Sequence, residues 1–504
     1  MSITGPGSIT ALNIQAVNNM NDQLNQLSTE LATNEKAQTY SDLSSQAGMA
    51  LSLNAQLSAL TGYSDTTSTV GTTLTLAQSV LSQLSGVGSS AEQALNESAT
   101  SAFTLDNNGQ TSEQSAAASQ LDEVLSLLNT QNGDNYLFSG KALSQASVAS
   151  TSEILNGNGA QAGFTQILQQ RAQADGVGGL GRLLIPAASG TTVTVSQDSA
   201  NSPFGFQLTG VNSSLTGATV TGPSGSPASI SIDMPTNPND GDSISFDLTL
   251  PDGSTQTITL QATSSATPGT NQFSIGATPA ATASNLQAAL STAVGNLAQT
   301  ALPAASAVAA ANNFFNSNPP QIVNGPPYNT ATSLVNGTPA NTVFWYTGES
   351  SATPARQTAT AQVGPDLSVS YGMRADEPAI SSLVANLAVL ASTTYSASDP
   401  NAQTSYQALT QKVTASLDGQ SGTQSISDIE ADLANAQTTV SDATKLNTQS
   451  QTTLTDMLQG IDGVNQTQIG EQLLTLQNSL SASLSVTARL AQLSLVNYLA
   501  PATG

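Results

Sequence analysis

The sequence predicts an α+β protein, with long antiparallel coiled-coil helices from both termini and a β-rich central insertion. In both end regions, apolar residues recur at alternating steps of three and four, the period of a helix that keeps one stripe towards a partner helix. In the middle, glycine and proline separate short runs in which apolar and polar residues alternate, the period of a half-buried strand. The expected segments are a helical region (1–145), an α+β insertion (146–340), a β segment that returns to the helices (341–375) and a second helical region (376–504).

The N-terminal region carries three apolar stripes. The first contains Leu24, Leu27 and Leu31, the second extends over residues 70–95 and the third over residues 117–128. No proline interrupts residues 9–135, which permits long helices. A repeat of seven residues corresponds to 3.5 residues per turn, so helices that keep this stripe buried wind around each other with a left-handed twist.

The C-terminal region repeats the pattern, with stripes over residues 380–390, 426–454 and 469–493. Such stripes can form the core face of an ordinary helical bundle. They are narrow, however, and Ser, Thr and Gln flank them in place of charged pairs. Ordering a residue costs about 1–2 kcal/mol of backbone entropy, and a buried leucine returns roughly 1.5–3 kcal/mol at only every third or fourth position. The terminal helices should therefore be marginal alone and gain stability beside other copies of the chain.

These considerations select a set of candidate assembly residues, eight leucines of the stripes and one tyrosine near the end of the chain. They are Leu24, Leu27, Leu31, Leu473, Leu476, Leu480, Leu484, Leu493 and Tyr498.

The central insertion combines predicted strands with two helices. The pair 243–250 (SISFDLTL) and 255–260 (TQTITL) flanks the turn Pro251-Asp252-Gly253, which predicts a β-hairpin. Residues 279–315 are rich in alanine and predict two helices divided at Pro303. The other predicted strands cover residues 191–196, 204–208, 228–234, 342–346, 358–363 and 367–371.

The composition excludes several kinds of chemistry. The 504 residues contain no His and no Cys, which excludes Ser-His-Asp and Cys-His nucleophile systems, disulfides and zinc sites with His or Cys ligands. The net charge of −24 disfavours binding to nucleic acid or to anionic membranes. No apolar run of 18 residues predicts a membrane span, and the first residues lack the pattern of a cleavable signal peptide. We expect no enzyme activity, no cofactor and no metal.

Three groups of residues suggest sites but have simpler explanations. Residues 176–181 (GVGGLG) fit a dinucleotide-binding motif, but a glutamine-rich helix is expected before them where that motif needs a strand. The oxygen-bearing side chains at 237–242 are better explained by the entrance to the hairpin than by a calcium loop. Asp428, Glu430 and Asp432 are spaced by two along a helix, so they should not converge. Lys36, Lys412, Lys445 and Arg489 are expected to be surface charges.

Five segments carry a resemblance to a known family. They are residues 135–141 (NYLFSGK), 343–349 (VFWYTGE), 369–377 (VSYGMRADE), 481–489 (SASLSVTAR) and 494–499 (SLVNYL). With them, the chain resembles the flagellin superfamily, and within it the hook-associated protein 3 family of hook-filament junction proteins. Filament flagellins typically carry an Asp-Asp-Ala-Ala-Gly-like stretch where residues 41–48 read SDLSSQAG, and tend to end in Leu-Leu-Arg where this chain ends NYLAPATG.

The resemblance implies a structural role in the bacterial flagellum. It implies that the terminal helices pair in an inner coiled-coil tube, that the insertion faces outward, and that the subunits leave the cell unfolded through the flagellar export channel. The implied partners are copies of the same chain in a ring or helical array, a neighbouring hook-associated protein, filament flagellin and an export chaperone.

Two alternatives remain open. The first is a flagellin that forms the filament itself. The second, from another class, is a secreted adhesin or carbohydrate-binding protein that uses its β-rich middle.

Overall fold

The computed structural model describes residues 6–36, 39, 43–99, 101–419 and 422–499, and it has an α+β fold. The chain divides into two compact units. Unit 1 comprises Met1–Gly71, Ala361–Val369 and Thr439–Gly504, and unit 2 comprises Thr72–Thr360 and Ser370–Thr438. Two of the boundaries lie inside the long helices that cover residues 47–98 and 426–462, so the units do not coincide with the four segments expected from the sequence. The division into those four segments stays a prediction.

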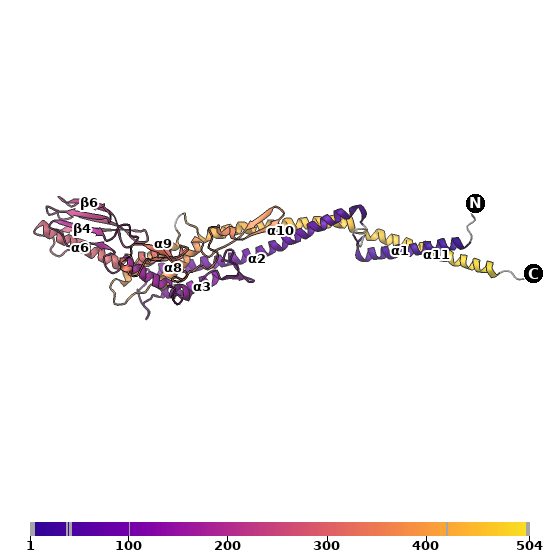
Figure 1. The fold of residues 1–504 in the computed structure, drawn as a ribbon, viewed down its shortest axis with the longest axis horizontal. Coiled ribbons are helices and arrows are strands. Elements are labelled where there is room, and N and C mark those ends of the chain that lie inside the picture. Colours follow the sequence, from indigo (N-terminus) through magenta and orange to yellow (C-terminus); the bar gives the residue numbers. More distant parts are fainter. Residues whose placement is uncertain (1–5, 37–38, 40–42, 100, 420–421, 500–504) are drawn as a thin grey trace, which may run out of the picture. The chain divides into compact units, whose positions relative to one another are not determined.

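Unit 1 is mainly helical. It contains α1 (Pro6–Thr33), the first part of α2 (Ala47–Ser98), the second part of α10 (Ile426–Asp462), α11 (Gln466–Leu499), most of the hairpin formed by β13 (Thr360–Gly364) and β14 (Leu367–Ser370), and the short 3-10 helix Ser44–Gln46. Helix α1 packs along α11 (Figure 1). A small apolar cluster, Ala50 and Leu53 of α2 with Ile461 of α10, joins the start of one helix to the end of the other. These two helix segments therefore run antiparallel.

Unit 2 contains the remaining helices. They are α3 (Ser112–Leu128), α4 (Thr151–Asn156), α5 (Phe164–Asp175), α6 (Pro279–Gln299), α7 (Ala301–Phe315), α8 (Pro378–Ser392) and α9 (Ala402–Leu417), with short 3-10 helices at Tyr328–Thr330 and Ala355–Thr358. Thr111 begins α3 in a capping box with Gln114. The buried Gln114 amide also donates to the carbonyl oxygens of Leu390 (3.1 Å) and Thr393 (2.7 Å). One side chain thus caps the start of α3 and the end of α8.

Two four-stranded sheets form most of the insertion. The first has the order β3 (Leu183–Leu184), β4 (Thr192–Gln197), β7 (Ser229–Asp233) and β6 (Thr219–Ser224), with antiparallel neighbours. The second has the order β10 (Gln272–Ser274), β9 (Thr255–Thr263), β8 (Ser243–Thr249) and β5 (Gln207–Ser213), in which β10 and β9 are parallel. Two-residue or three-residue strands pair as β1 (Gln131–Asn132) with β2 (Asn135–Tyr136), and β11 (Gln321–Val323) with β12 (Leu334–Asn336).

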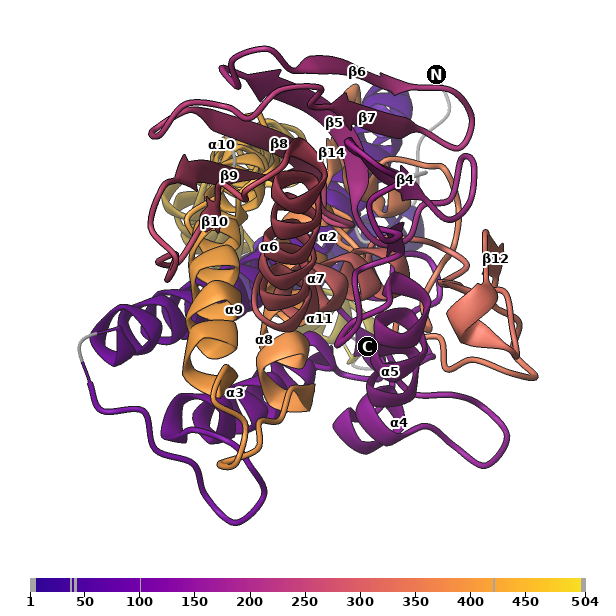
Figure 2. The same ribbon diagram turned by 90° about the vertical axis from the view of Figure 1, so that its left-hand side faces the viewer.

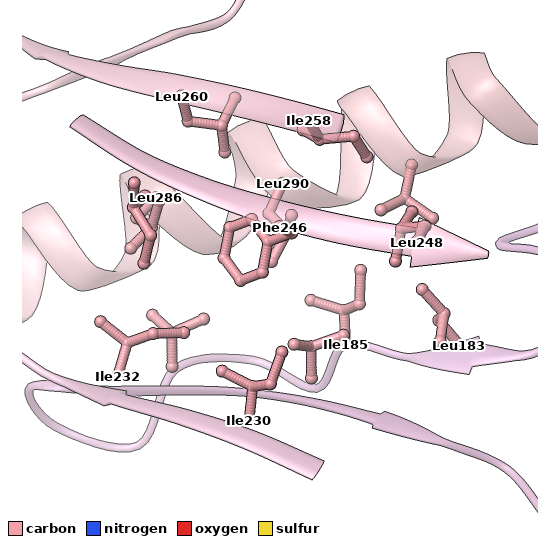
Figure 3. Close-up of a cluster of buried hydrophobic side chains, with 14 of the residues drawn as sticks. Leu183, Ile185, Ile230, Ile232, Phe246, Leu248, Ile258, Leu260, Leu286 and Leu290 are labelled. Carbon is pink, nitrogen blue, oxygen red and sulfur yellow. The ribbon is translucent and has the colours of Figure 1, made fainter. Parts of the chain in front are cut away.

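The core of the insertion lies between these sheets. Phe246 and Leu248 of β8 point towards Ile230 and Ile232 of β7, and leucines of α6 close the side of the cluster (Figure 3). The alternation of buried and partly exposed residues along β7 and β8 gives one apolar face to each sheet. Figure 2 shows the strands on one side of α6 and α7, and α8, α9 and α3 on the other side.

The structure confirms the predicted hairpin, in which β8 pairs with β9 from Ser243 opposite Gln261 to Thr249 opposite Thr255. Three local predictions are wrong. The two alanine-rich helices divide at Thr300, because Pro303 lies in the first turn of α7, where its missing N–H is tolerated. Residues 342–346 form isolated bridges to Ala162 and Val148 in place of a strand. Phe204 precedes β5 and is buried against α5.

Candidate assembly surface

The α1–α11 pair of unit 1 carries the candidate assembly residues. Three contacts join the residues that follow α1 to the end of α10, the connection after it and the start of α11. The backbone N–H of Lys36 donates to the carbonyl oxygen of Asp462 (2.6 Å), Glu35 forms an antiparallel bridge with Gly463, and the Gln466 amide donates to Asn34 Oδ1 (3.3 Å). The end of α1 therefore lies near the start of α11. Since the two helices also pack along each other, they run antiparallel.

The predicted leucines are incompletely covered by this pairing. Leu31 and Leu484 are 38% and 51% exposed. The other described members of the set, Leu24, Leu27, Leu473, Leu476 and Leu480, are partly buried. Leu493 and Tyr498 lie outside the residues whose side chains the structure describes. The pairing of α1 with α11 therefore leaves Leu31 and Leu484 exposed and the other described stripe leucines only partly buried.

Sequence reasoning missed a second set of exposed apolar side chains in unit 1. Leu12 and Leu474 are 62% and 63% exposed, although both lie on helices of the α1–α11 pair. Leu474 follows the stripe position Leu473, and Leu12 lies before the first stripe, so the search for a three-and-four period selected neither. The other members of this set are Ile14, Met49, Leu51, Leu446, Met457 and Val486.

Together, the described candidate leucines and this second set are the exposed or partly buried apolar side chains that we call the apolar surface of unit 1. Covering one such side chain completely contributes roughly 1.5–3 kcal/mol. A partner that covers several of them would contribute on the order of several kcal/mol.

A buried hydrogen bond in unit 1 joins α10 to the β13–β14 hairpin. Asn447 of α10 is 2% exposed, and its side-chain amide donates to the carbonyl oxygen of Val363 in β13 (2.9 Å). Without this acceptor the buried amide would have no hydrogen-bond partner, because water does not reach it. The contact therefore holds the β13–β14 hairpin on α10.

In unit 2, three of the family-like segments meet at one place, which we call the motif junction. Residues 135–141 contact 343–349 where the N–H of Glu349 donates to the Ser139 carbonyl oxygen (2.9 Å). They contact the 369–377 segment where Gly140 N–H donates to Met373 and Ala375 N–H donates to Phe138 (3.1 and 2.9 Å). Segments more than 200 positions apart in the sequence are thus joined by backbone hydrogen bonds.

Charged side chains reinforce the motif junction. Glu377 is 4% exposed and accepts two hydrogen bonds from the Arg356 guanidinium (2.9 and 2.6 Å). It also accepts from the Arg374 N–H (3.3 Å) and from the Gln424 amide (3.2 Å). Burial raises the pKa of the neighbouring Asp376. The charge of Arg374 acts to lower this pKa, and the charge of Glu377 acts to raise it further. All of these hydrogen bonds join residues of the same chain, so we assign Glu377 a structural role in the motif junction.

The weaker motifs have structural roles. Helix α5 precedes residues 176–181, as predicted, and Gly176 ends that helix in the left-handed conformation. In the loop at residues 237–242, Asp242 accepts hydrogen bonds from the N–H groups of Thr216 and Asn239 (2.8 and 2.9 Å). Asp428 accepts from the Ser425 N–H at the start of α10 (2.8 Å). Among the described residues, no group of three His, Cys, Asp or Glu side chains could hold a metal ion.

One of the predicted surface charges is paired and largely buried. The Lys412 side chain is 17% exposed and lies 2.5 Å from Asp252 Oδ2. Its partner is 160 positions away, in the turn of the β8–β9 hairpin, so the sequence gave no indication of the pair. Lys445, in contrast, is 74% exposed, as expected, and pairs with Asp442 on its own helix.

The sequence matches no protein-family model, and no curated protein matches it significantly. Within the described part of the chain, no helix is both long and apolar enough to cross a membrane.

Proposed function

We propose that this chain is a structural, non-enzymatic axial component of the bacterial flagellum, which joins the hook to the filament. The terminal helices form a coiled coil together with those of neighbouring copies, and they complete their folding during assembly. The partners are further copies of the chain in a ring or helical array, a neighbouring hook-associated protein and filament flagellin. The protein acts outside the cell, after export with the help of a chaperone.

The observation that carries this proposal is the apolar surface of unit 1. A chain that stays monomeric gains no further burial of its half-exposed leucines. An assembling subunit does gain, because each such side chain loses its contact with water when a neighbour covers it. The family-like segments 135–141, 343–349 and 369–377 support the same proposal.

Removal of residues 470–504 tests the proposal. We expect the shortened chain to keep a folded unit 2, reported by the fluorescence of Trp345, and to be absent from purified flagella. Incorporation at the level of the full chain would contradict the proposal.

A pair of point variants tests the surface itself. Leu476→Asp places a carboxylate where the assembled helices exclude water. An unpaired buried charge costs on the order of several kcal/mol. The matched control is Gln477→Asp, which adds the same charge at the next, exposed position. We expect loss of incorporation for Leu476→Asp alone. Equal incorporation of both variants would refute a role of the stripe.

Immunogold labelling of intact flagella distinguishes the junction from the filament. Label confined to one short zone beside the hook supports the proposed function, whereas label along the whole filament identifies a flagellin. Binding of a surface carbohydrate by the chain, without incorporation into flagella, would favour the adhesin.

A further inference from the structure

The β-rich insertion, here residues 183–298, is attached to the helices of unit 2 at a neck. The chain enters through residues 176–182 and leaves at Thr300, between α6 and α7. At the neck, Arg171 pairs with Asp175 (2.8 Å) and donates to the Pro203 carbonyl oxygen (3.1 Å). Asp175 also accepts from the Gly205 N–H (2.9 Å).

A second attachment lies at the turn of the β8–β9 hairpin. Lys412 Nζ of α9 lies 2.5 Å from Asp252 Oδ2 and donates to Ser254 Oγ (2.6 Å). Asp252 Oδ1 accepts from the N–H and the hydroxyl of Ser254 (3.1 and 2.6 Å), which fixes the carboxylate towards the lysine. The Lys412 and Asp252 side chains are only 17% and 8% exposed.

We propose that the ion pair between Lys412 and Asp252 is a latch that fixes the orientation of the insertion on the helices of unit 2. A body attached at one region can rotate about that region, and a second attachment removes this freedom. The hydrogen bond from Asn401 to Gln299 (2.6 Å) cannot replace the latch, because Gln299 is next to Thr300 and so belongs to the neck. When the latch opens, the insertion rotates about the neck without unfolding.

The surroundings of the latch support this role. Asp252, Gly253, Ser254 and Lys412 line one end of a groove of about 1280 Å³, which continues between α2, α7, α8 and α9. The turn therefore borders the open space of the groove. Breaking a largely buried ion pair leaves one charge without its partner. The latch is consequently closed at neutral pH and sensitive to a single substitution.

The latch is independent of the proposed function, since it concerns the isolated chain. The absence of Cys allows a direct measurement with two introduced spin labels, Thr221→Cys on β6 and Ser119→Cys on α3, both at exposed positions. We compare the distance distribution between the labels in the otherwise unchanged chain and in the variants Lys412→Met and Asp252→Asn. Trp345 fluorescence in each variant establishes that unit 2 is folded.

We expect a single narrow distribution for the unchanged chain and at least a twofold broader one for each latch variant. The matched control is Lys445→Met, which removes the same charge from an exposed pair, and it should leave the width unchanged. Asp252→Asn changes the side-chain shape least, so it provides the test if Lys412→Met fails to fold. A folded variant of either kind whose distribution stays as narrow as that of the control would overturn the proposal.

Discussion

The fastening of the motif junction by Glu377 can be tested with Glu377→Gln. Glutamine keeps the shape of the side chain but removes the charge that Arg356 contacts at 2.9 and 2.6 Å. Removing one partner of a buried ion pair costs about 3–5 kcal/mol. The Arg356 side chain is 18% exposed and keeps Asp432 at 3.5 Å, so we expect the lower end of this range. A loss of about 3 kcal/mol corresponds to roughly a hundredfold change in the folding equilibrium.

Urea unfolding measures this loss through Trp345, the only tryptophan of the chain. Trp345 is 2% exposed and lies in the 343–349 segment of the motif junction, so its fluorescence reports on the structure that Glu377 stabilises. The control is Asp134→Asn, which removes an exposed carboxylate and should change the free energy of unfolding by less than about 0.5 kcal/mol. If Glu377→Gln is as stable as this control, the ion pair does not hold the junction.

Three further predictions concern assembly and titration. Leu474→Asp changes a side chain that is 63% exposed, so the isolated chain should keep its circular dichroism and thermal stability while its incorporation into flagella falls; unchanged incorporation would remove this residue from the apolar surface. Burial raises the pKa of Asp252, but its contacts with Lys412 and Ser254 outweigh burial and hold the pKa below the ordinary value of 3.8. The latch should therefore be intact above pH 3.8 and weaken as the pH falls further, and broadening of the spin-label distance distribution already at pH 6 would disagree. Burial raises the pKa of Tyr346, Tyr371, Tyr395 and Tyr406 above 10.0, so an ultraviolet titration should show these phenols ionising last, and stability should decline as the pH rises past 10.

Local patterns in the sequence were sufficient to predict many of the elements. The 243–260 hairpin was predictable because a strong turn signal separates two runs of period two, and the pairing of such runs is local. Residues 204–208 predict a strand because they form a short run of alternating β-formers, but Phe204 instead fills a cluster with Ala174, Val323 and Ala331. Tertiary packing outweighed the local preference there.

The contacts that organise unit 2 could not be predicted. Lys412 looked like a surface charge because nothing near it in the sequence indicates its partner Asp252. The hydrogen bonds of the motif junction likewise join residues 135–141 to segments far along the chain. For the apolar surface, the period of the stripes selected Leu31 and Leu484 but not Leu12 or Leu474, because exposure depends on which helix covers which face.

Hydrogen exchange of α1 and α11 tests the central claim most directly. The account predicts that their backbone amides exchange rapidly in the isolated full-length chain and become strongly protected after its incorporation into flagella, while the core strands β7 and β8 are protected in both states. Equal protection of α1 and α11 before and after incorporation would show that these helices need no neighbour, and it would contradict the account.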